Sequence, residues 1–199
     1  TASDPLPGMG TAGTGPWVSA ATLVAVETGL PVRMCGFASG GKPIAYWHPG
    51  EPGHVGLFPV IEQAGQGADV FLWYQGENDC GGRLSTAEYR HELTQHVARV
   101  RAAAGNPEML AVIIQLGPAT REGRSGFMAL REAQRQFVLH DAHAVLVPAL
   151  GRTLKDSVHL DTPGYAELGR EIGRAVLKCR HRKPVGDWPG PVLDAAVLR

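Results

Sequence analysis

The stretch Val70-Phe71-Leu72-Trp73-Tyr74-Gln75-Gly76-Glu77-Asn78-Asp79 decides how the rest of the chain is interpreted. Apolar and aromatic residues run without polar alternation into a Gln-Gly-Glu turn. Such a run, ended by glycine, predicts a strand that is buried on both faces and opens into a loop at its C-terminal end. In open parallel sheets ligands bind at that end. A polar strand-to-helix loop without function is the alternative that loop composition leaves open. The candidate site residues of this loop are Gln75, Glu77, Asn78 and Asp79.

Strand-like and helix-like segments alternate along the rest of the chain. Buried strands are indicated by short apolar runs, and helices by apolar residues three and four positions apart. Alternation of this kind predicts an α/β fold with a parallel, doubly wound sheet. The expected strands are 32–37, 69–74, 110–116 and 144–149. The expected helices are 16–29, 55–65, 87–104 with Thr86 as N-cap, 126–139 and 163–178.

Composition limits the possible classes of function. The 199 residues suit one α/β domain, and lysine plus arginine equal aspartate plus glutamate at 19 each. Because the formal net charge is zero, no long-range field attracts nucleic acid or an anionic membrane. No apolar run is long enough for a transmembrane helix. No signal peptide is visible, but a processed secreted protein would also lack one, so the compartment stays open.

The cysteines and histidines do not indicate a metal site or a disulfide framework. Cys35, Cys80 and Cys179 are odd in number and widely spaced, which predicts free thiols that are buried or half-buried. The histidine pairs lack a neighbouring set of carboxylates, so no metal site is expected. Those pairs are His140 and His143, which flank a charged turn, and His91 and His96, which are assigned to the polar side of a helix.

Aromatic residues could contact a sugar. Trp47 and His48 lie in an irregular stretch and are expected to be partly exposed, so either could present a face to a carbohydrate. Trp73 could do the same, but its place in an apolar strand favours the core.

The spacing Asp156-x-x-His159 follows the last expected strand and precedes the last expected helix. At this separation the imidazole Nδ1–H can donate to the carboxylate. That bond fixes the tautomer and stabilises the imidazolium formed when Nε2 takes a proton. Asp161 is a competing partner, and Asp161 or Thr162 could simply cap the following helix. A capping carboxylate beside an exposed histidine is therefore the alternative to a catalytic pair.

Four motifs stand out when the chain is taken as a whole. They are Ala38-Ser39-Gly40-Gly41, Trp73-Tyr74-Gln75-Gly76-Glu77, Leu130-Arg131-Glu132-Ala133-Gln134, and Asp156-Ser157-Val158-His159 followed by Gly164-Tyr165. In order, spacing and strand context they resemble the sialate O-acetylesterase and acetylxylan esterase branch of the SGNH (GDSL-type) hydrolases. The resemblance extends from about residue 5 to about residue 195.

The resemblance implies a flavodoxin-like, three-layer α/β/α fold. It also implies a metal-free serine esterase that needs no cofactor and removes O-acetyl groups from acetylated carbohydrate. In that chemistry His159 would be the general base and Asp156 the residue that orients it.

The resemblance also implies roles for the loop residues. Backbone N–H groups at Gly40 or Gly41, together with the side chain of Gln75, would form the oxyanion hole. Donors aimed at a developing oxyanion contribute about 3–4 kcal/mol each. Glu77 and Asp79 would hold the loop rather than contact substrate.

One departure from the family concerns the nucleophile. The family carries its serine in an N-terminal Gly-Gln-Ser-Asn block just after the first strand, and this sequence has no such block. Residues 1–6 resemble the region downstream of that block, and residues 188–193 resemble a linker to a further β-rich domain. A hydrolase-like domain is therefore expected over residues 1–181, and a linker over residues 182–199.

The first strand of such a fold lies between the strands expected at 32–37 and 69–74. Without it both strands have unpaired inner edges, which are costly to bury. We therefore expect the missing strand to come from residues outside the sequence, from another chain, or from 192–198 folding back.

The serines within the chain are weaker candidates for the nucleophile. Ser39 lies at a strand end near the expected oxyanion site, whereas Ser19 lies on a helix, Ser125 in a loop and Ser157 inside the Asp-x-x-His turn. The serine is accordingly expected outside the chain. The alternative function is a non-catalytic carbohydrate-binding or structural module that keeps the fold and belongs to a larger assembly.

Overall fold

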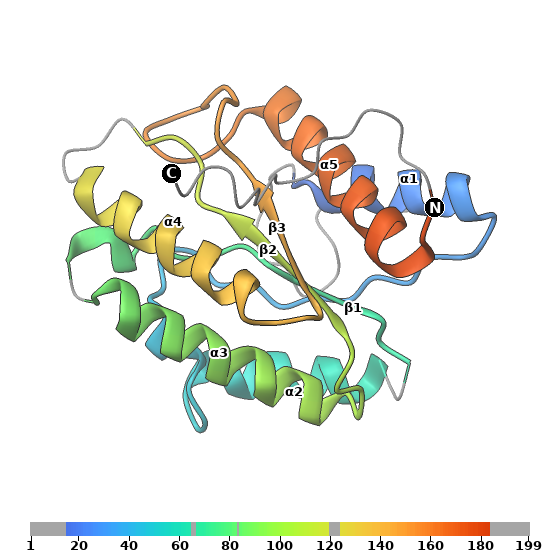
Figure 1. The fold of residues 1–199 in the computed structure, drawn as a ribbon, viewed down its shortest axis with the longest axis horizontal. Coiled ribbons are helices and arrows are strands. Elements are labelled where there is room, and N and C mark those ends of the chain that lie inside the picture. Colours follow the sequence, from blue (N-terminus) through green and yellow to red (C-terminus); the bar gives the residue numbers. More distant parts are fainter. Residues whose placement is uncertain (1–14, 65–66, 83, 120–123, 184–199) are drawn as a thin grey trace.

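The computed structural model describes residues 15–64, 67–82, 84–119 and 124–183 (Figure 1). Helices and strands alternate along these residues, which confirms the α/β class. The elements are α1 (Trp17–Thr28), η1 (Ile44–Trp47), α2 (Pro52–Ala64), β1 (Val70–Trp73), η2 (Asp79–Gly81), α3 (Thr86–Ala103), β2 (Leu110–Gln115), α4 (Arg124–Leu139), β3 (Ala144–Pro148) and α5 (Thr162–His181).

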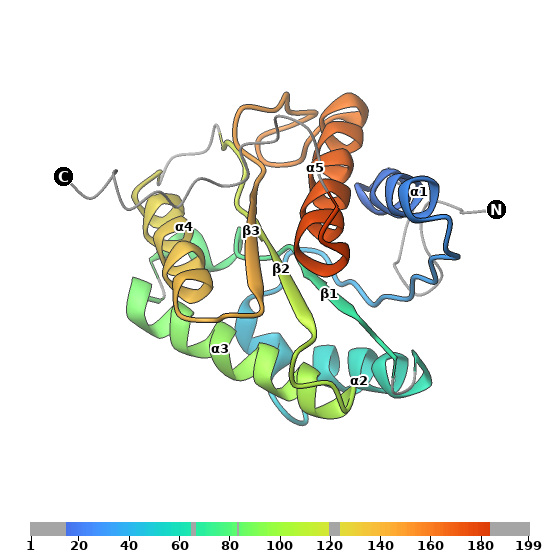
Figure 2. The ribbon, with the colours of Figure 1, turned by 45° about the vertical axis from the view of Figure 1, so that its right-hand side comes forward.

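The sheet of the described residues has three parallel strands in the order β1-β2-β3. Successive side chains of β2 enter two separate apolar cores, as a strand buried on both faces requires. Ala111 and Ile113 pack with residues of α3 and α4, whereas Val112 and Ile114 pack with residues of α1 and α5. Figure 2 shows the resulting three layers, with α1 and α5 on one face and α2, α3 and α4 on the other.

The prediction of a strand over residues 32–37 is wrong. Residues 31–37 have no helix or strand assignment, and β1 pairs only with β2 among the described residues. A strand exists only through backbone hydrogen bonds to a neighbour, and none of the described strands lies next to this segment. Strand propensity alone therefore does not place 32–37 in the sheet.

Local signals set most helix ends. α1 ends at Gly29, whose φ of 69° is the left-handed conformation that glycine adopts easily. α3 is capped by Ser85 and not by Thr86 as predicted. Ser85 accepts a hydrogen bond from the N–H of Glu88, and the Glu88 carboxylate accepts one from the N–H of Ser85. This reciprocal capping box fixes the start one residue earlier than expected.

Two further predictions concern regions at or beyond the described residues. The proposed linker over 182–199 lies outside them except for residues 182 and 183. Among the helices that the structure describes, none combines the length and apolarity needed to cross a membrane.

Candidate active site

Gln75 lies at the end of β1, and hydrogen bonds hold its side chain in place. Its Nε2 donates to the carbonyl of Lys42 at 3.0 Å and to Oδ2 of Asp79 at 2.6 Å. Both hydrogens of the amide are therefore used. Asp79 is 2% exposed and also accepts a hydrogen bond from the N–H of Ile44, at 2.9 Å. Gln75 thus orders the loop after β1. Its amide could donate to an oxyanion only after releasing the Lys42 carbonyl or the Asp79 carboxylate.

Two buried residues that sequence reasoning missed complete the support of Gln75. The hydroxyl of Tyr89 on α3 donates to Oε1 of Gln75, at 2.9 Å, and lies 3.1 Å from its carbonyl oxygen. Nε2 of Gln134 on α4 donates to the same carbonyl oxygen, at 3.2 Å. The signal for Gln134 was available, because it lies in the Leu-Arg-Glu-Ala-Gln motif. Tyr89 lies in none of the motifs that carry the resemblance.

The glycine turn lies beside this loop, as predicted. Nδ2 of Asn78 donates to the carbonyl of Gly41 at 2.8 Å, so the two loops are tied together at two neighbouring carbonyls, those of Gly41 and Lys42. Gly41 has a φ of 65°, which favours glycine. Neither Gly40 nor Gly41 donates a backbone hydrogen bond to another described residue.

Asp156 and His159 form the predicted pair. Nδ1 of His159 lies 2.8 Å from Oδ2 of Asp156. Oδ1 of Asp156 accepts hydrogen bonds from the N–H groups of His159, at 2.8 Å, and Val158, at 2.9 Å. These backbone donors, together with the imidazole, hold the pKa of the Asp156 carboxyl well below its usual range. Because Nδ1 donates to the carboxylate, Nε2 is the nitrogen that can accept a proton.

The competing role proposed for Asp161 is resolved by the geometry. Asp161 caps α5 by accepting a hydrogen bond from the N–H of Gly164, at 2.8 Å, and a second one from the hydroxyl of Thr153. The antiparallel bridge between Leu154 and Leu160 closes the intervening residues into a narrow loop. Asp161 therefore holds the base of this loop, and Asp156 orients the histidine at its tip.

Glu77 connects the histidine loop to the β1 loop. Its carboxyl is half-buried, and burial raises its pKa, while the nearby charge of His159 acts in the opposite direction and that of Asp79 adds to the increase. The same carboxyl raises the pKa of Tyr74 and Tyr165, although burial is the larger cause in both. Glu77 and His159 therefore lie within electrostatic reach of each other over the carboxyl end of the sheet.

The surface expectations for Trp47 and His96 are wrong. Trp47 is buried and packs edge-on against Trp73, whose predicted place in the core is confirmed. His96 is completely buried against Trp73 instead of lying on the polar side of its helix. His48 is partly exposed, as expected, and its Nε2 lies 2.7 Å from the carboxylate of Glu92.

The burial of the cysteines agrees with the sequence prediction only in part. Cys35, Cys80 and Cys179 are free thiols, but Cys35 and Cys179 are exposed, and only Cys80 is buried. Within residues 15–64, 67–82, 84–119 and 124–183, no group of three or more histidine, cysteine, aspartate or glutamate side chains could hold a metal ion.

The comparison of the whole sequence with protein families decides the identity. The model of the family described as carbohydrate esterase, sialic acid-specific acetylesterase matches residues 2–178. The chain belongs to this family. Membership of this acetylesterase family confirms the resemblance to the sialate O-acetylesterase-like branch of the SGNH hydrolases. No curated protein matches the chain in sequence.

Solved structures confirm the fold of this acetylesterase-family chain. A protein from Arabidopsis thaliana is 24% identical, with a TM-score of 0.74 over 85% of this chain and 70% of that one. A carbohydrate acetylesterase from Xanthomonas citri is 19% identical, with a TM-score of 0.67 over 83% of this chain and 41% of that one. A carbohydrate esterase family 3 protein from Talaromyces cellulolyticus is 16% identical, with a TM-score of 0.60 over 83% and 92%. At these identities the likeness concerns the fold.

Proposed function

We propose that this protein is a serine-type carbohydrate O-acetylesterase whose nucleophilic serine lies outside these 199 residues. The observation that supports this most directly is the bond between Asp156 and Nδ1 of His159, because it prepares Nε2 to act as a base. Family membership supports the acetylated carbohydrate as substrate.

The proposed reaction uses this chain's residues in three roles. Nε2 of His159 takes the proton of the serine hydroxyl as the serine oxygen attacks the acetyl carbonyl carbon. Backbone N–H groups of Gly40 or Gly41 donate to the resulting oxyanion. The imidazolium, stabilised by Asp156, then returns the proton to the sugar oxygen as the C–O bond breaks. Water hydrolyses the acetyl-enzyme by the same proton transfers and releases acetate.

The supporting residues have a separate role in this proposal. Asp79, Tyr89 and Gln134 hold Gln75, which in turn holds the Lys42 carbonyl next to the glycine turn. Gln75 itself becomes an oxyanion donor only if substrate displaces one of its two acceptors. Glu77 lies within electrostatic reach of His159 and needs no direct contact with the sugar.

The test is hydrolysis of p-nitrophenyl acetate and of an O-acetylated sialic acid by the full-length protein. We expect turnover that His159→Ala abolishes and that His91→Ala, a change of an exposed histidine on α3, leaves unchanged. A folded full-length protein that binds the acetylated sugar without releasing acetate would contradict the esterase proposal. That result would favour the carbohydrate-binding module, the second function that the missing serine block allows.

A further inference from the structure

Buried nitrogen atoms without a hydrogen-bond partner gather where α2, α3 and η1 meet. Among the described residues they include both ring nitrogens of His96, Nδ1 of His54, Nε and Nη2 of Arg99, and the indole Nε1 of Trp47. Buried polar groups nearly always have a hydrogen-bond partner, because leaving one without any is costly. A cluster of such groups therefore indicates a ligand that offers hydrogen-bond acceptors.

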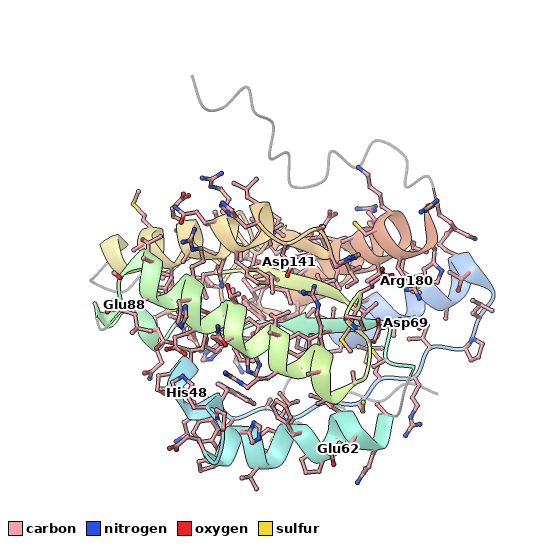
Figure 3. All side chains as sticks on the ribbon, turned by 60° about the horizontal axis from the view of Figure 1, so that its bottom comes forward. His48, Glu62, Asp69, Glu88, Asp141 and Arg180 are labelled. Atoms are coloured by element: carbon pink, nitrogen blue, oxygen red, sulfur yellow. The ribbon has the colours of Figure 1, made fainter. Side chains whose placement is uncertain are left out.

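These side chains come from three elements and converge on one place. His96 and Arg99 are three positions apart on α3, so they lie on the same face of the helix. The ring of His96 lies 6.2 Å from that of Trp47 in η1, centroid to centroid. The charges of Arg99 and of His54 on α2 both act on His96, so both lie within electrostatic reach of its imidazole. Figure 3 shows α2 and α3 next to each other, with His48 at the end of η1.

Arg99 supplies a donor with two prongs. Its Nε and Nη2 form one edge of the planar guanidinium, and both are buried without an acceptor among the described residues. This edge fits two oxygens of a carboxylate or a phosphate in a bidentate pair. Other half-buried arginines use their donors within the protein, since Arg101 pairs with Asp141 and Arg131 donates to the carbonyl of Leu116. Arg99 differs from them because its fork faces no protein oxygen.

The chemistry of the surrounding groups favours an anion. The guanidinium of Arg99 and the indole of Trp47 can only donate, and a histidine donates from one nitrogen when neutral and from two when protonated. The nearby carboxylate of Glu92 already lies 2.7 Å from Nε2 of His48. A ligand that meets these donors must therefore accept several hydrogen bonds, and the charge of Arg99 favours one that is negative.

The burial of these residues limits the size of the ligand. His96 is completely buried, whereas Arg99 and His54 are partly exposed, so a ligand that arrives from solvent meets these two residues first. The rings of His96 and Trp73 are 4.3 Å apart, centroid to centroid, which leaves no space for a ligand between them. The ligand is therefore small and contacts only the outer edge of the imidazole.

We propose that Arg99, His54 and His96 form a binding site for a small oxyanion, either inorganic phosphate or a carboxylate, between α2 and α3. Nε and Nη2 of Arg99 bind two of its oxygens, and the imidazoles and the indole of Trp47 donate to the oxyanion beside them. None of these residues belongs to the proposed active site.

The bound oxyanion also reaches the loops around Gln75 through η1. The N–H of Ile44 at the start of η1 donates to Asp79, and Trp47 at its end packs against Trp73, the last residue of β1. A ligand that ties Trp47 to α2 and α3 therefore stabilises η1 at both ends. This segment follows the glycine turn directly, so the site offers a way for an oxyanion to rigidify that turn.

The experiment titrates the full-length protein with phosphate and, separately, with acetate, by calorimetry at pH 7. Sodium chloride keeps the ionic strength constant and serves as the control salt. We expect saturable binding of at least one of the two and, at about ten times its Kd, a rise of about 3 °C in the thermal midpoint. Hydrogen exchange at the amides of Tyr46 and His48, which donate within η1, should slow at least about threefold, while α5 should not change.

Three variants test the assignment to Arg99. Arg99→Lys keeps the positive charge but loses the fork, so it should weaken binding at least about tenfold. Arg99→Gln removes the charge as well and should abolish binding. Arg170→Gln changes an exposed arginine of α5, on the other face of the sheet, and should bind like the unchanged protein. His54→Phe should also weaken binding and replaces the Arg99→Gln comparison if that variant does not fold.

The outcomes separate the possible occupants. Binding of phosphate alone or of acetate alone supports the site and names its ligand. Equal effects of phosphate, acetate and chloride overturn the proposal, because they reflect salt in general, and so does binding that persists in Arg99→Gln. Absence of saturable binding overturns it too, and would assign these donors to water. Neither readout uses hydrolysis, so the esterase proposal can fail while this one stands.

Discussion

The side-chain amide of Gln75 donates to Oδ2 of Asp79 across 2.6 Å inside the loop that follows β1. This bond joins the residues just after β1 to the first residue of η2. Through the N–H of Ile44, the same carboxylate oxygen also holds the start of η1. One buried acidic group therefore fixes three segments that meet at the candidate site.

Asp79→Leu should destabilise the protein by about 2–4 kcal/mol, because two buried donors, on Gln75 and Ile44, lose their acceptor. Urea unfolding followed by tryptophan fluorescence measures this loss. Asn78→Ala is the matched control, because Asn78 is exposed and its side chain donates to the carbonyl of Gly41. This variant should lose less than about 1 kcal/mol of the free energy of unfolding. Equal losses for the two variants would show that Asp79 does not organise the loop.

If the proposed function holds, Asp156→Asn should lower kcat of the full-length protein by about 10²–10⁴ while leaving its free energy of unfolding almost unchanged. The asparagine can still accept from the backbone N–H groups, but it cannot hold the imidazole in the tautomer that makes Nε2 the base. Steady-state kinetics with p-nitrophenyl acetate give the value. Asp161→Ala should do the reverse: it removes the acceptor that caps α5 and should lower the thermal midpoint, with little effect on kcat.

His96 should make the fold sensitive to mild acid. Burial, reinforced by the positive charges of Arg99, His54 and His48, lowers the pKa of His96 to about 3. The unfolded chain, with an ordinary histidine pKa near 6.5, binds the proton first. The neutral, buried His96 therefore contributes fully to the free energy of unfolding above about pH 6.5. Its contribution falls as the pH decreases, by about 2 kcal/mol between pH 7 and pH 5.

The test of this pH dependence compares urea unfolding at pH 7 and pH 5. His96→Phe keeps an aromatic ring in the cluster with Trp73 and removes the titrating group. Between pH 7 and pH 5 this variant should therefore lose about 2 kcal/mol less of its free energy of unfolding than the unchanged protein. His140→Ala, at an exposed position, should behave like the unchanged protein. An unaltered pH slope in His96→Phe would assign the acid sensitivity to other groups.

Gly126→Ala should lower the free energy of unfolding by about 2 kcal/mol or more, because it disturbs the contact between α4 and η2. A Cβ at Gly126 would lie 1.8 Å from the carbonyl oxygen of Cys80, and backbone cannot move aside as a flexible side chain does. Gly81→Ala is the control in the same region, because a Cβ there meets nothing within 4 Å. Thermal unfolding of the two variants should separate them clearly, and a shared small effect would argue against close packing.

The sequence predicted those features that depend on neighbouring residues. Apolar runs fixed β1, β2 and β3 to within one or two residues, because a strand buried on both faces needs such a run. Asp156 and His159 are three positions apart, so a turn is enough to bring them together. The same local argument failed for Thr86, since the actual cap uses Ser85 and the capping box it forms with Glu88.

Features that depend on distant residues were decided by the tertiary structure. Sequence alone suggested that Trp47 is partly exposed and that His96 lies on a polar face, yet both are buried beside Trp73. The surroundings of Gln75 also could not be predicted, because its partners come from α3, α4 and the glycine turn. The segment 32–37 has the composition of a strand, but a strand forms only where a neighbour supplies hydrogen bonds. Composition and spacing thus determined the class, the order of elements and the histidine pair, while burial and pairing depended on which segments meet in space.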